Sequence, residues 1–204
     1  MPYDVAADIR LDPRLKAILA SMPVESAGDV ESREALLAEA NSEAARQQAE
    51  LFRSFMELCD TEDAAPSAGL RVHTEKVVSE PDGNSINLQV IRPERDEAVA
   101  CVYYIHGGGM AALSCYDGMY RGWGKIIAAN GVAVVMVDFR NSLVPSSVPE
   151  VAPFPAGLND CVSGLKWVAA NAGHLGIDPA RVIVAGESGE FLEGKHSRPL
   201  HPAC

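Results

Sequence analysis

The sequence predicts an α/β fold whose sheet is mostly parallel and doubly wound, and three observations support this. Residues 70–91 contain two alternating segments around a turn, which indicates a β-hairpin. Residues 98–185 then alternate apolar strand-like segments with helix-like segments. Two of the apolar strands run directly into glycine motifs. A hairpin followed by strand, helix, strand, helix and strand favours parallel pairing of the later strands, with helices on both faces of the sheet.

The hairpin is predicted from residues 70–79 and 85–91, which flank a Pro-Asp-Gly-Asn turn at residues 81–84. In the second segment, apolar side chains occupy alternate positions and therefore share one face of the strand: Ile86, Leu88 and Val90. Three later segments are apolar at nearly every position, which predicts buried strands with both faces covered. They are residues 98–105, 132–137 and 181–185.

Helices are predicted between these strands and in the N-terminal part of the chain. Residues 116–130 form one helix, which Gly131 closes. A second helix ends near residues 171–173, with apolar residues at helical spacing: Leu158, Cys161, Val162, Leu165 and Val168. Residues 8–62 read as amphipathic helices, which a Pro- and Gly-containing linker at 62–69 separates from the sheet. Their apolar positions include Leu15, Ile18, Leu19, Leu36, Leu37, Leu51, Phe52, Phe55 and Met56.

Composition excludes several classes of function. The 204 residues are 48% hydrophobic and 22% charged, with a formal net charge of −11. An acidic chain without a basic stripe repels phosphate backbones, so we expect no nucleic-acid partner. No apolar run is long enough for a transmembrane segment, and the N-terminus does not resemble a secretory signal. The five cysteines form no C-x-x-C pair, which favours a cytoplasmic protein with no metal and no cofactor.

Two glycine motifs carry the candidate chemistry. The first, His-Gly-Gly-Gly-Met at residues 106–110, follows an apolar strand, and its glycines allow the backbone N–H groups to approach a ligand closely. The second, Gly-Glu-Ser-Gly at residues 186–189, places Ser188 at the sharp strand-to-helix turn typical of a nucleophilic serine. A serine that attacks a carbonyl generates an oxyanion, and each N–H donor that meets it contributes about 10²–10³ in rate. The pair therefore favours acyl hydrolysis over nucleotide binding, because neither G-x-G-x-x-G nor a P-loop sequence occurs.

Six segments follow, in order, the landmarks of a known family. They are residues 106–110, Val-Asp-Phe-Arg at 137–140, Pro-Phe-Pro-Ala-Gly-Leu-Asn-Asp at 153–160, Lys-Trp-Val at 166–168, Gly-Ile-Asp-Pro-Ala-Arg at 176–181 and Val-Ala-Gly-Glu-Ser-Gly at 184–189. Over residues 70–189 the chain resembles the hormone-sensitive-lipase-like esterases, a branch of the α/β-hydrolase fold.

The resemblance implies a role for each matching residue. Ser188 is the expected nucleophile, and the oxyanion donors are expected to be Gly108, Gly109 and Gly189. His106 is expected to order its loop rather than act as the base. Three further residues are expected to be scaffold: Asp138, Arg140 and Asp160. The substrate would be a small-molecule acyl ester.

The same resemblance implies three parts: a helical cap segment over residues 1–62, a partial α/β-hydrolase core over 70–189, and a tail over 190–204 that is unlike the family and reads as disordered. The family carries its catalytic Asp and His downstream of the serine. Residues 190–204 contain His196 and His201 but no Asp, and no element that would aim an imidazole. The sequence thus reads as C-terminally truncated, by a frameshift or an alternative transcript end, and we expect very little activity from these 204 residues. A metal site formed by His196, His201 and Cys204 is not expected.

Two other functions stay open from the sequence. One is a non-catalytic ligand-binding homologue on the same scaffold, and the other is amidase or deacetylase chemistry at the same serine. The sequence is also compatible with a homo-oligomer.

Overall fold

The computed structural model describes residues 9, 11–16 and 31–188. The chain divides into two compact units, residues 1–33 and 34–204. The second unit contains the sheet. The predicted tail at 190–204 lies outside the described residues.

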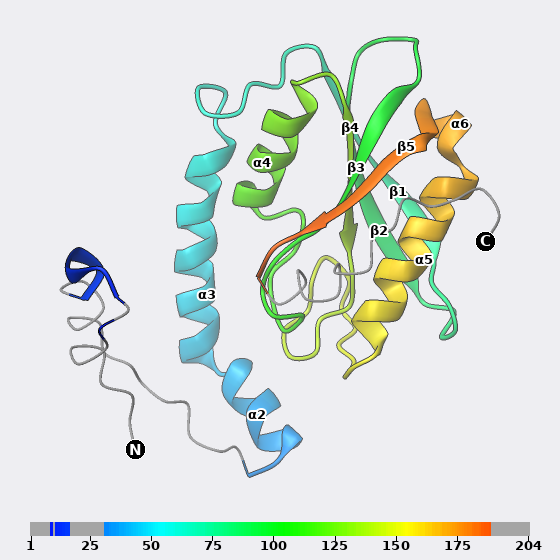
Figure 1. Cartoon of the computed structure of the whole chain (residues 1–204). Helices are drawn as coiled ribbons and strands as arrows, with labels where there is room; N and C mark the ends of the chain where they lie inside the picture. The colour runs from blue at the N-terminus through cyan, green and yellow to red at the C-terminus, as the bar shows by residue number, and fades with distance from the viewer. Residues whose placement is uncertain (1–8, 10, 17–30, 189–204) are drawn as a thin grey trace. The chain divides into compact units, whose positions relative to one another are not determined.

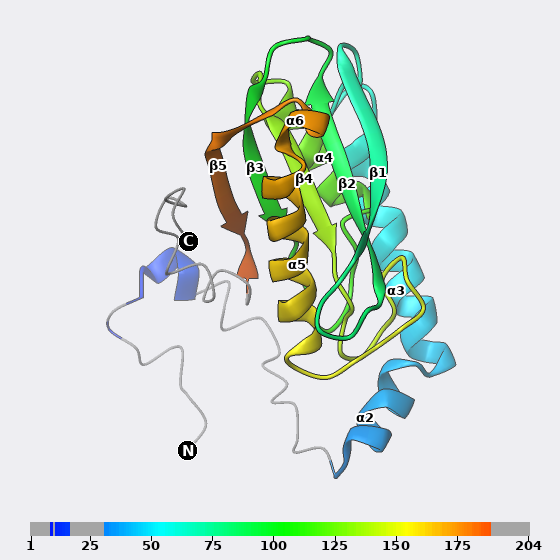
Figure 2. The same cartoon turned by 90° about the vertical axis from the view of Figure 1, so that its right-hand side faces the viewer.

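The sheet has five strands in the order β1-β2-β4-β3-β5 (Figures 1 and 2). Strands β1 and β2 form the predicted hairpin, and β2 pairs with β4 in the antiparallel sense. Strand β3 lies between β4 and β5 and is parallel to both. This confirms the α/β fold with parallel later strands. The strands span Leu70–Val78 (β1), Ser85–Pro93 (β2), Val99–Ile105 (β3), Ala133–Asp138 (β4) and Ile177–Gly186 (β5).

Helices cover both faces of the sheet. Helix α5, Ala156–Ala170, lies on one face, and helix α4, Gly118–Ala128, lies on the other (Figure 2). The short helix α6, Ala172–Leu175, ends at Gly176, which adopts the left-handed conformation that glycine tolerates best. Helix α4 is two residues shorter at each end than the apolar pattern suggested.

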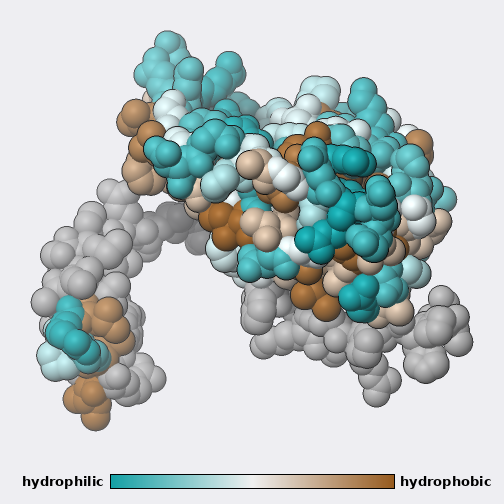
Figure 3. All heavy atoms as spheres, turned by 90° about the horizontal axis from the view of Figure 1, so that it is seen from above, coloured by the Kyte–Doolittle hydropathy of each residue, from teal (hydrophilic) through white to brown (hydrophobic). Residues whose placement is uncertain are grey.

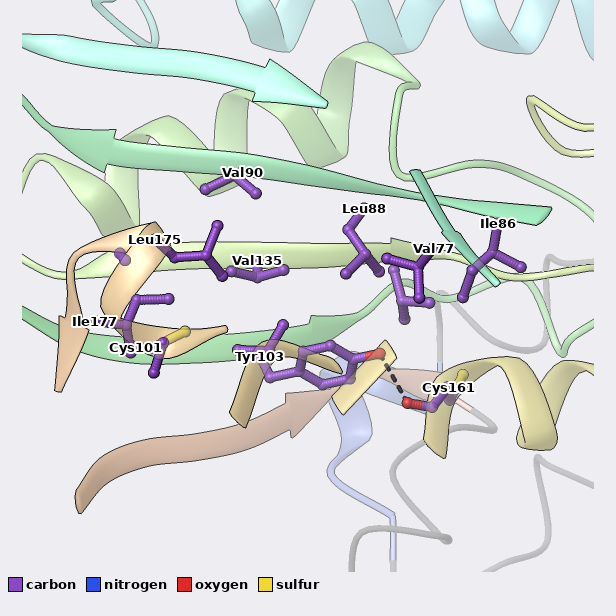
Figure 4. Packing of buried hydrophobic residues seen from close by; sticks show 14 of the residues in the cluster. Val77, Ile86, Leu88, Val90, Cys101, Tyr103, Val135, Cys161, Leu175 and Ile177 are labelled. Carbon is purple, nitrogen blue, oxygen red and sulfur yellow. Dashed lines mark hydrogen bonds between the residues drawn. The ribbon is translucent and has the colours of Figure 1, made fainter. Parts of the chain in front are cut away.

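The main core lies between the sheet and α5. Its aliphatic residues come from every strand, and Tyr103 on β3 is fully buried among them (Figure 4). The Tyr103 hydroxyl donates a hydrogen bond of 2.8 Å to the carbonyl oxygen of Cys161 on α5. Without this bond the buried hydroxyl would lack a hydrogen-bond partner. Ile86, Leu88 and Val90 are buried as the alternation predicted. A smaller cluster, which includes Met136, lies under α4.

Helices α2 (Arg33–Ala40) and α3 (Glu43–Met56) and the 3₁₀ helix η1 (Glu57–Asp60) precede the sheet. The apolar stripe predicted for α3 is only partly buried. Met56 is enclosed, but the other large apolar side chains of α3 and η1 are exposed: Leu51, Phe52, Phe55 and Leu58. Helical periodicity reports which side chains share a face and does not report whether that face is covered.

The third strand predicted at 181–185 is present, but the prediction that it is buried is wrong. Strand β5 is longer, and it is the edge strand of the sheet among the described residues. Val182 and Val184 pack against the main core, whereas Ile183 is 61% exposed. An apolar segment indicates a strand that can be covered on both faces, but the covering has to come from other elements.

Figure 3 shows the molecule from above, relative to the view of Figure 1. On this face the described surface is mainly hydrophilic, with small hydrophobic groups scattered across it. Within residues 31–188 and the short described N-terminal stretch, no helix has the length and apolar character to cross a bilayer.

Candidate active site

Strands β3 and β5 bring the two glycine motifs to one edge of the sheet. The strands are parallel neighbours, and their last paired residues are Ile105 and Gly186 (Figure 1). The residues that follow, the triple-glycine loop on one side and Glu187 and Ser188 on the other, therefore leave the sheet side by side. The carboxyl edge of a parallel sheet is where α/β proteins build their ligand sites.

The two loops approach so closely that a side chain on Gly107 would collide. A Cβ atom on this residue would lie 2.7 Å from Oε1 of Glu187 and 3.1 Å from the Tyr120 hydroxyl. Real Cβ contacts are essentially never below 3.0 Å. Because Oε1 is the end of a flexible side chain, a larger residue at position 107 would displace it, and the short distance shows that the triple-glycine loop lies next to the residue before Ser188.

Gly108 and Gly109 form a tight turn directly after this contact. Their φ angles are +116° and +63°, both in the region that favours glycine. A Cβ atom on Gly108 would lie 2.3 Å from the backbone oxygen of Ala112, and the Gly108 carbonyl accepts hydrogen bonds from the N–H groups of Ala111 and Ala112 at 3.0 and 3.3 Å. The turn fixes the direction of these peptide planes.

Ser188 follows β5 with a φ angle of +59°, and it is exposed. For a residue other than glycine, this conformation costs about 1–3 kcal/mol and persists only when the surroundings impose it. The strained turn after a strand is the feature predicted for a nucleophile elbow. The third predicted oxyanion donor, Gly189, lies outside the described residues.

Glu187 connects the elbow to two other elements. Its Oε2 accepts a hydrogen bond of 3.1 Å from the Tyr104 hydroxyl on β3. Tyr120 on α4 is also near this carboxylate, and burial, followed by the hydrogen bond to Glu187, raises the pKa of Tyr120 above its usual value. Sequence reasoning missed this cluster. The tyrosines stand 83 and 67 positions before Glu187 in the chain, and neither belongs to a local pattern.

His106 is buried and ordered by stacking. Its ring lies 4.3 Å from that of Phe139 with an interplanar angle of 6°, and its Nδ1 lies 2.8 Å from the carbonyl oxygen of Gly107. Its Nε2 has no hydrogen-bond partner among the described residues. Burial lowers the pKa of His106 below its usual value, so the neutral ring is favoured. These contacts agree with a loop-ordering residue.

The carboxylate of Asp138 ties together loops at the same edge of the sheet. It accepts hydrogen bonds from the Ser114 hydroxyl at 2.5 Å, from the Ser147 N–H at 2.9 Å, and from the Ser147 hydroxyl. Asp160 is also fully buried, and its Oδ2 accepts a hydrogen bond of 2.9 Å from Nε of Arg140. Both carboxylates therefore act as scaffold, in agreement with the sequence prediction.

No candidate general base faces Ser188 among the described histidines. His73 and His174 each lie 3.3 Å from Glu75 on β1, which is at the opposite edge of the sheet from β5. His196 and His201 lie outside the described residues. Within the described part of the chain, no group of three or more His, Cys, Asp or Glu side chains is arranged to hold a metal ion.

A cavity of about 280 Å³ adjoins the glycine turn. It is lined by Gly109, Met110, Arg140, Ser142, Ala152, Phe154, Gly157 and Leu158. Its wall is mixed in polarity, and the Arg140 guanidinium in it is already engaged by Asp160 and Asp82. A cavity of this kind beside the predicted oxyanion donors could hold part of an ester.

Comparison with known proteins adds the family. The BD-FAE family matches residues 88–192. Structures of the esterase Est22, including its S188A mutant, are 60% identical to this chain, cover 91% of it and 55% of Est22, and superpose with a TM-score of 0.79. Brefeldin A esterase, a bacterial homologue of human hormone-sensitive lipase, is 30% identical, with 90% of this chain and 50% of that one covered and a TM-score of 0.64.

Carboxylesterase NlhH of Mycobacterium tuberculosis is 41% identical over 96 residues, which are 46% of this chain and 27% of NlhH. The chain thus spans about half the length of the two esterase structures and a smaller part of NlhH. The strand order, the paired glycine motifs and these similarities agree. The chain belongs to the BD-FAE family and to the hormone-sensitive-lipase-like esterases of the α/β-hydrolase fold.

Proposed function

We propose that this chain carries the nucleophile and the oxyanion hole of a carboxylic-ester hydrolase that acts on small-molecule acyl esters. The observation that carries the proposal is the contact between Gly107 and Glu187 at the ends of β3 and β5. It brings the triple-glycine turn to the residue before Ser188. The esterase relatives support the same reading.

In the proposed reaction, the Ser188 hydroxyl attacks the acyl carbonyl carbon while a general base takes its proton. The carbonyl oxygen becomes an oxyanion, which the N–H groups of Gly108, Gly109 and Gly189 stabilise. The tetrahedral intermediate expels the alcohol, which receives the proton, and leaves an acyl group on Ser188. Water then attacks the acyl-enzyme by the same route, releasing a carboxylic acid and restoring the serine.

A polypeptide of these 204 residues should hydrolyse esters very slowly by itself. The described residues offer Ser188 no base, and loss of the histidine from such a triad costs about 10⁶-fold in turnover. Imidazole added to the solution can replace a missing histidine as the base. We therefore expect a slow, imidazole-dependent acetylation of Ser188 by p-nitrophenyl acetate.

The test measures p-nitrophenol release with rising imidazole and locates the acetyl group by mass spectrometry of the peptide that contains Ser188. The matched control is Ser188→Ala, which also corrects for direct hydrolysis by imidazole. A wild-type rate that exceeds the control, with acetyl on Ser188, supports the proposal. Equal rates and an unmodified Ser188 contradict it. Replacing the ester by the corresponding p-nitroanilide tests amide chemistry at the same serine.

We also propose that residues 1–62 form a cap segment of this hydrolase. Helix α3 exposes large apolar side chains, among them Phe52 and Phe55. Their exposure supports a role for this segment in contacting apolar groups, as a cap over a substrate does. A cytoplasmic location and a homo-oligomeric state stay predictions.

A further inference from the structure

A groove of about 570 Å³ lies between helix α3 and two loops, away from the Ser188 elbow. Neither the triple-glycine turn nor Glu187 nor Ser188 lines it. It is lined by Asn41, Arg46 and Arg53 from the helical segment, by Ser114, Tyr116 and Asp117 from one loop, and by Val144, Pro145, Ser146 and Ser147 from the other. Its volume is within the range of small-molecule sites.

Two arginines of α3 face this groove with free donors. Arg46 and Arg53 are seven residues apart, which is two helical turns, so they share a face. The hydrogen bond of Arg46 runs from Nε to the carbonyl oxygen of Asn41 at 2.8 Å. Arg53 forms an ion pair with Asp117, in which Nε lies 3.6 Å from Oδ1, beyond hydrogen-bond distance. The terminal N–H groups of both guanidinium groups therefore have no partner among the described residues.

Two arginines line the groove in a chain whose formal net charge is −11, and the buried carboxylate of Asp138 lies behind its Ser114 and Ser147, whose hydroxyls it binds. Asp117 is its acidic residue, against two arginines. The carboxylate of Asp117 is already engaged, because its Oδ2 accepts a hydrogen bond of 3.0 Å from the Ser114 N–H. Burial raises the pKa of Asp117, and the hydrogen bond from Ser114 and the nearby Arg53 act against this rise. An anion entering the groove would meet donors that the protein leaves unused.

The loop side of the groove includes an apolar wall that is held in place. Val144, Pro145 and the ring of Tyr116 form this wall. Nδ2 of Asn41 donates to the carbonyl oxygen of Leu143 at 2.9 Å, which fastens the loop to the helical segment. The Tyr116 hydroxyl is paired with Thr74 at 2.8 Å. A wall that is fixed before binding lowers the ordering cost of a ligand.

We propose that this groove binds an amphiphilic carboxylate: the guanidinium groups of Arg46 and Arg53 hold the carboxylate, and Val144, Pro145 and Tyr116 contact its apolar body. Arginine is suited to this role because its planar fork of N–H donors matches the two carboxylate oxygens. The site is independent of the proposed catalysis, because its residues take no part in that reaction.

Octanoate is the probe, and its dissociation constant for the 204-residue chain is measured by isothermal titration calorimetry. We expect Arg46→Gln combined with Arg53→Gln to weaken octanoate binding at least about tenfold, since hydrogen bonds to charged groups are the stronger ones. Arg71→Gln is the matched control, because Arg71 is an exposed arginine on β1 outside the groove, and it should leave the dissociation constant unchanged. Thermal unfolding of each variant checks that it is folded. Arg46→Gln is also made alone, because Arg46 is exposed and its replacement should not disturb the fold.

Three further ligands separate the sources of binding. Acetate has the charge without the apolar body, 1-octanol has the body without the charge, and inorganic phosphate is a compact anion. Octanoate binding that exceeds all three and depends on the arginines supports the proposal. Octanoate binding that neither Arg46→Gln nor the double variant changes overturns it, and so does arginine-dependent binding of phosphate that is tighter than that of octanoate.

Discussion

Positive φ angles in residues other than glycine occur in the loops that contain the two glycine motifs. Among the described residues, those other than glycine with positive φ are Met110, Leu113 and Ser188, and all three lie in the loops that follow β3 and β5. Such strain persists where the surroundings over-determine the backbone, and it is frequent at active sites. At Ser188 and in the triple-glycine loop, the surroundings rather than local propensity thus set the backbone conformation.

The buried ring of His106 makes stability depend on pH. Its pKa is lowered by burial, while in the unfolded chain it is close to 6.5. Between these two values the unfolded state binds a proton that the folded state does not, so stability falls as the pH drops below about 6.5. We expect the free energy of unfolding of the wild type to decrease more from pH 7.5 to pH 5.5 than that of His106→Gln.

Urea unfolding at the two pH values measures this difference, and it cancels the contribution of carboxyl groups such as Asp117, which both proteins share. A wild type and a variant with the same pH dependence would show that His106 takes up its proton in the folded state as readily as in the unfolded one.

Asp160 and Asp178 contrast a buried ion pair with an exposed one. Asp160 is fully buried and binds Arg140, which is 6% exposed. Asp160→Ala leaves a buried guanidinium with one partner fewer, and we expect a loss of about 3–5 kcal/mol. Asp178→Ala removes the surface pair with Arg181 and should change stability little. Thermal unfolding compares the two, and similar losses in both variants would contradict the account.

At the scale of elements, η1 fastens the helical segment to α4. Glu57 accepts a hydrogen bond of 3.1 Å from the Gly118 N–H at the start of α4, and it also binds Arg121 at 2.6 Å. Asp60 binds Arg121 and Lys125 from the next turn, at 2.6 and 2.8 Å. A carboxylate at a helix N-terminus satisfies a free N–H group and interacts favourably with the helix dipole.

Gly122 is the contact point of this packing. A Cβ atom there would lie 2.2 Å from the backbone oxygen of Cys59, which can move only if η1 moves. Gly122→Ala should therefore destabilise the protein by about 1–3 kcal/mol, although alanine is the better helix former. Gly173→Ala is the control, because a Cβ atom on Gly173 has no neighbour within 4 Å. A neutral Gly122→Ala in thermal unfolding would show that η1 and α4 pack loosely.

Apart from the short helix α6, the order and type of the elements after residue 70 could be predicted from the sequence, because apolar periodicity and glycine turns are local signals. Coverage could not. The apolar segment at 181–185 predicts a buried strand, but Ile183 is exposed, and the amphipathic pattern of α3 does not tell that its Phe55 is exposed. Burial depends on what packs against an element, and an amphipathic pattern does not contain that information.

At the scale of the whole molecule, parallel strand pairing explains how a site can be predicted from motifs about 80 positions apart. Two motifs at the carboxyl ends of parallel strands meet if the strands are neighbours, and β3 and β5 are neighbours. The surroundings of the elbow were not predictable in this way. Tyr104 and Tyr120 reach Glu187 because of the sheet order and the placement of α4, and both follow from the packing of the whole fold.

The central claim is that the backbone N–H groups of Gly108 and Gly109 and the hydroxyl of Ser188 converge on one carbonyl. A crystal structure of the chain after reaction with diethyl p-nitrophenyl phosphate in the presence of imidazole, which replaces the missing base, tests it most directly, because the phosphoryl oxygen of the adduct stands in for the oxyanion. The account predicts phosphorus bonded to Ser188 Oγ, with the phosphoryl oxygen about 2.7–3.1 Å from the nitrogen atoms of Gly108 and Gly109. An adduct on another residue, or a phosphoryl oxygen turned away from those two nitrogen atoms, would contradict it.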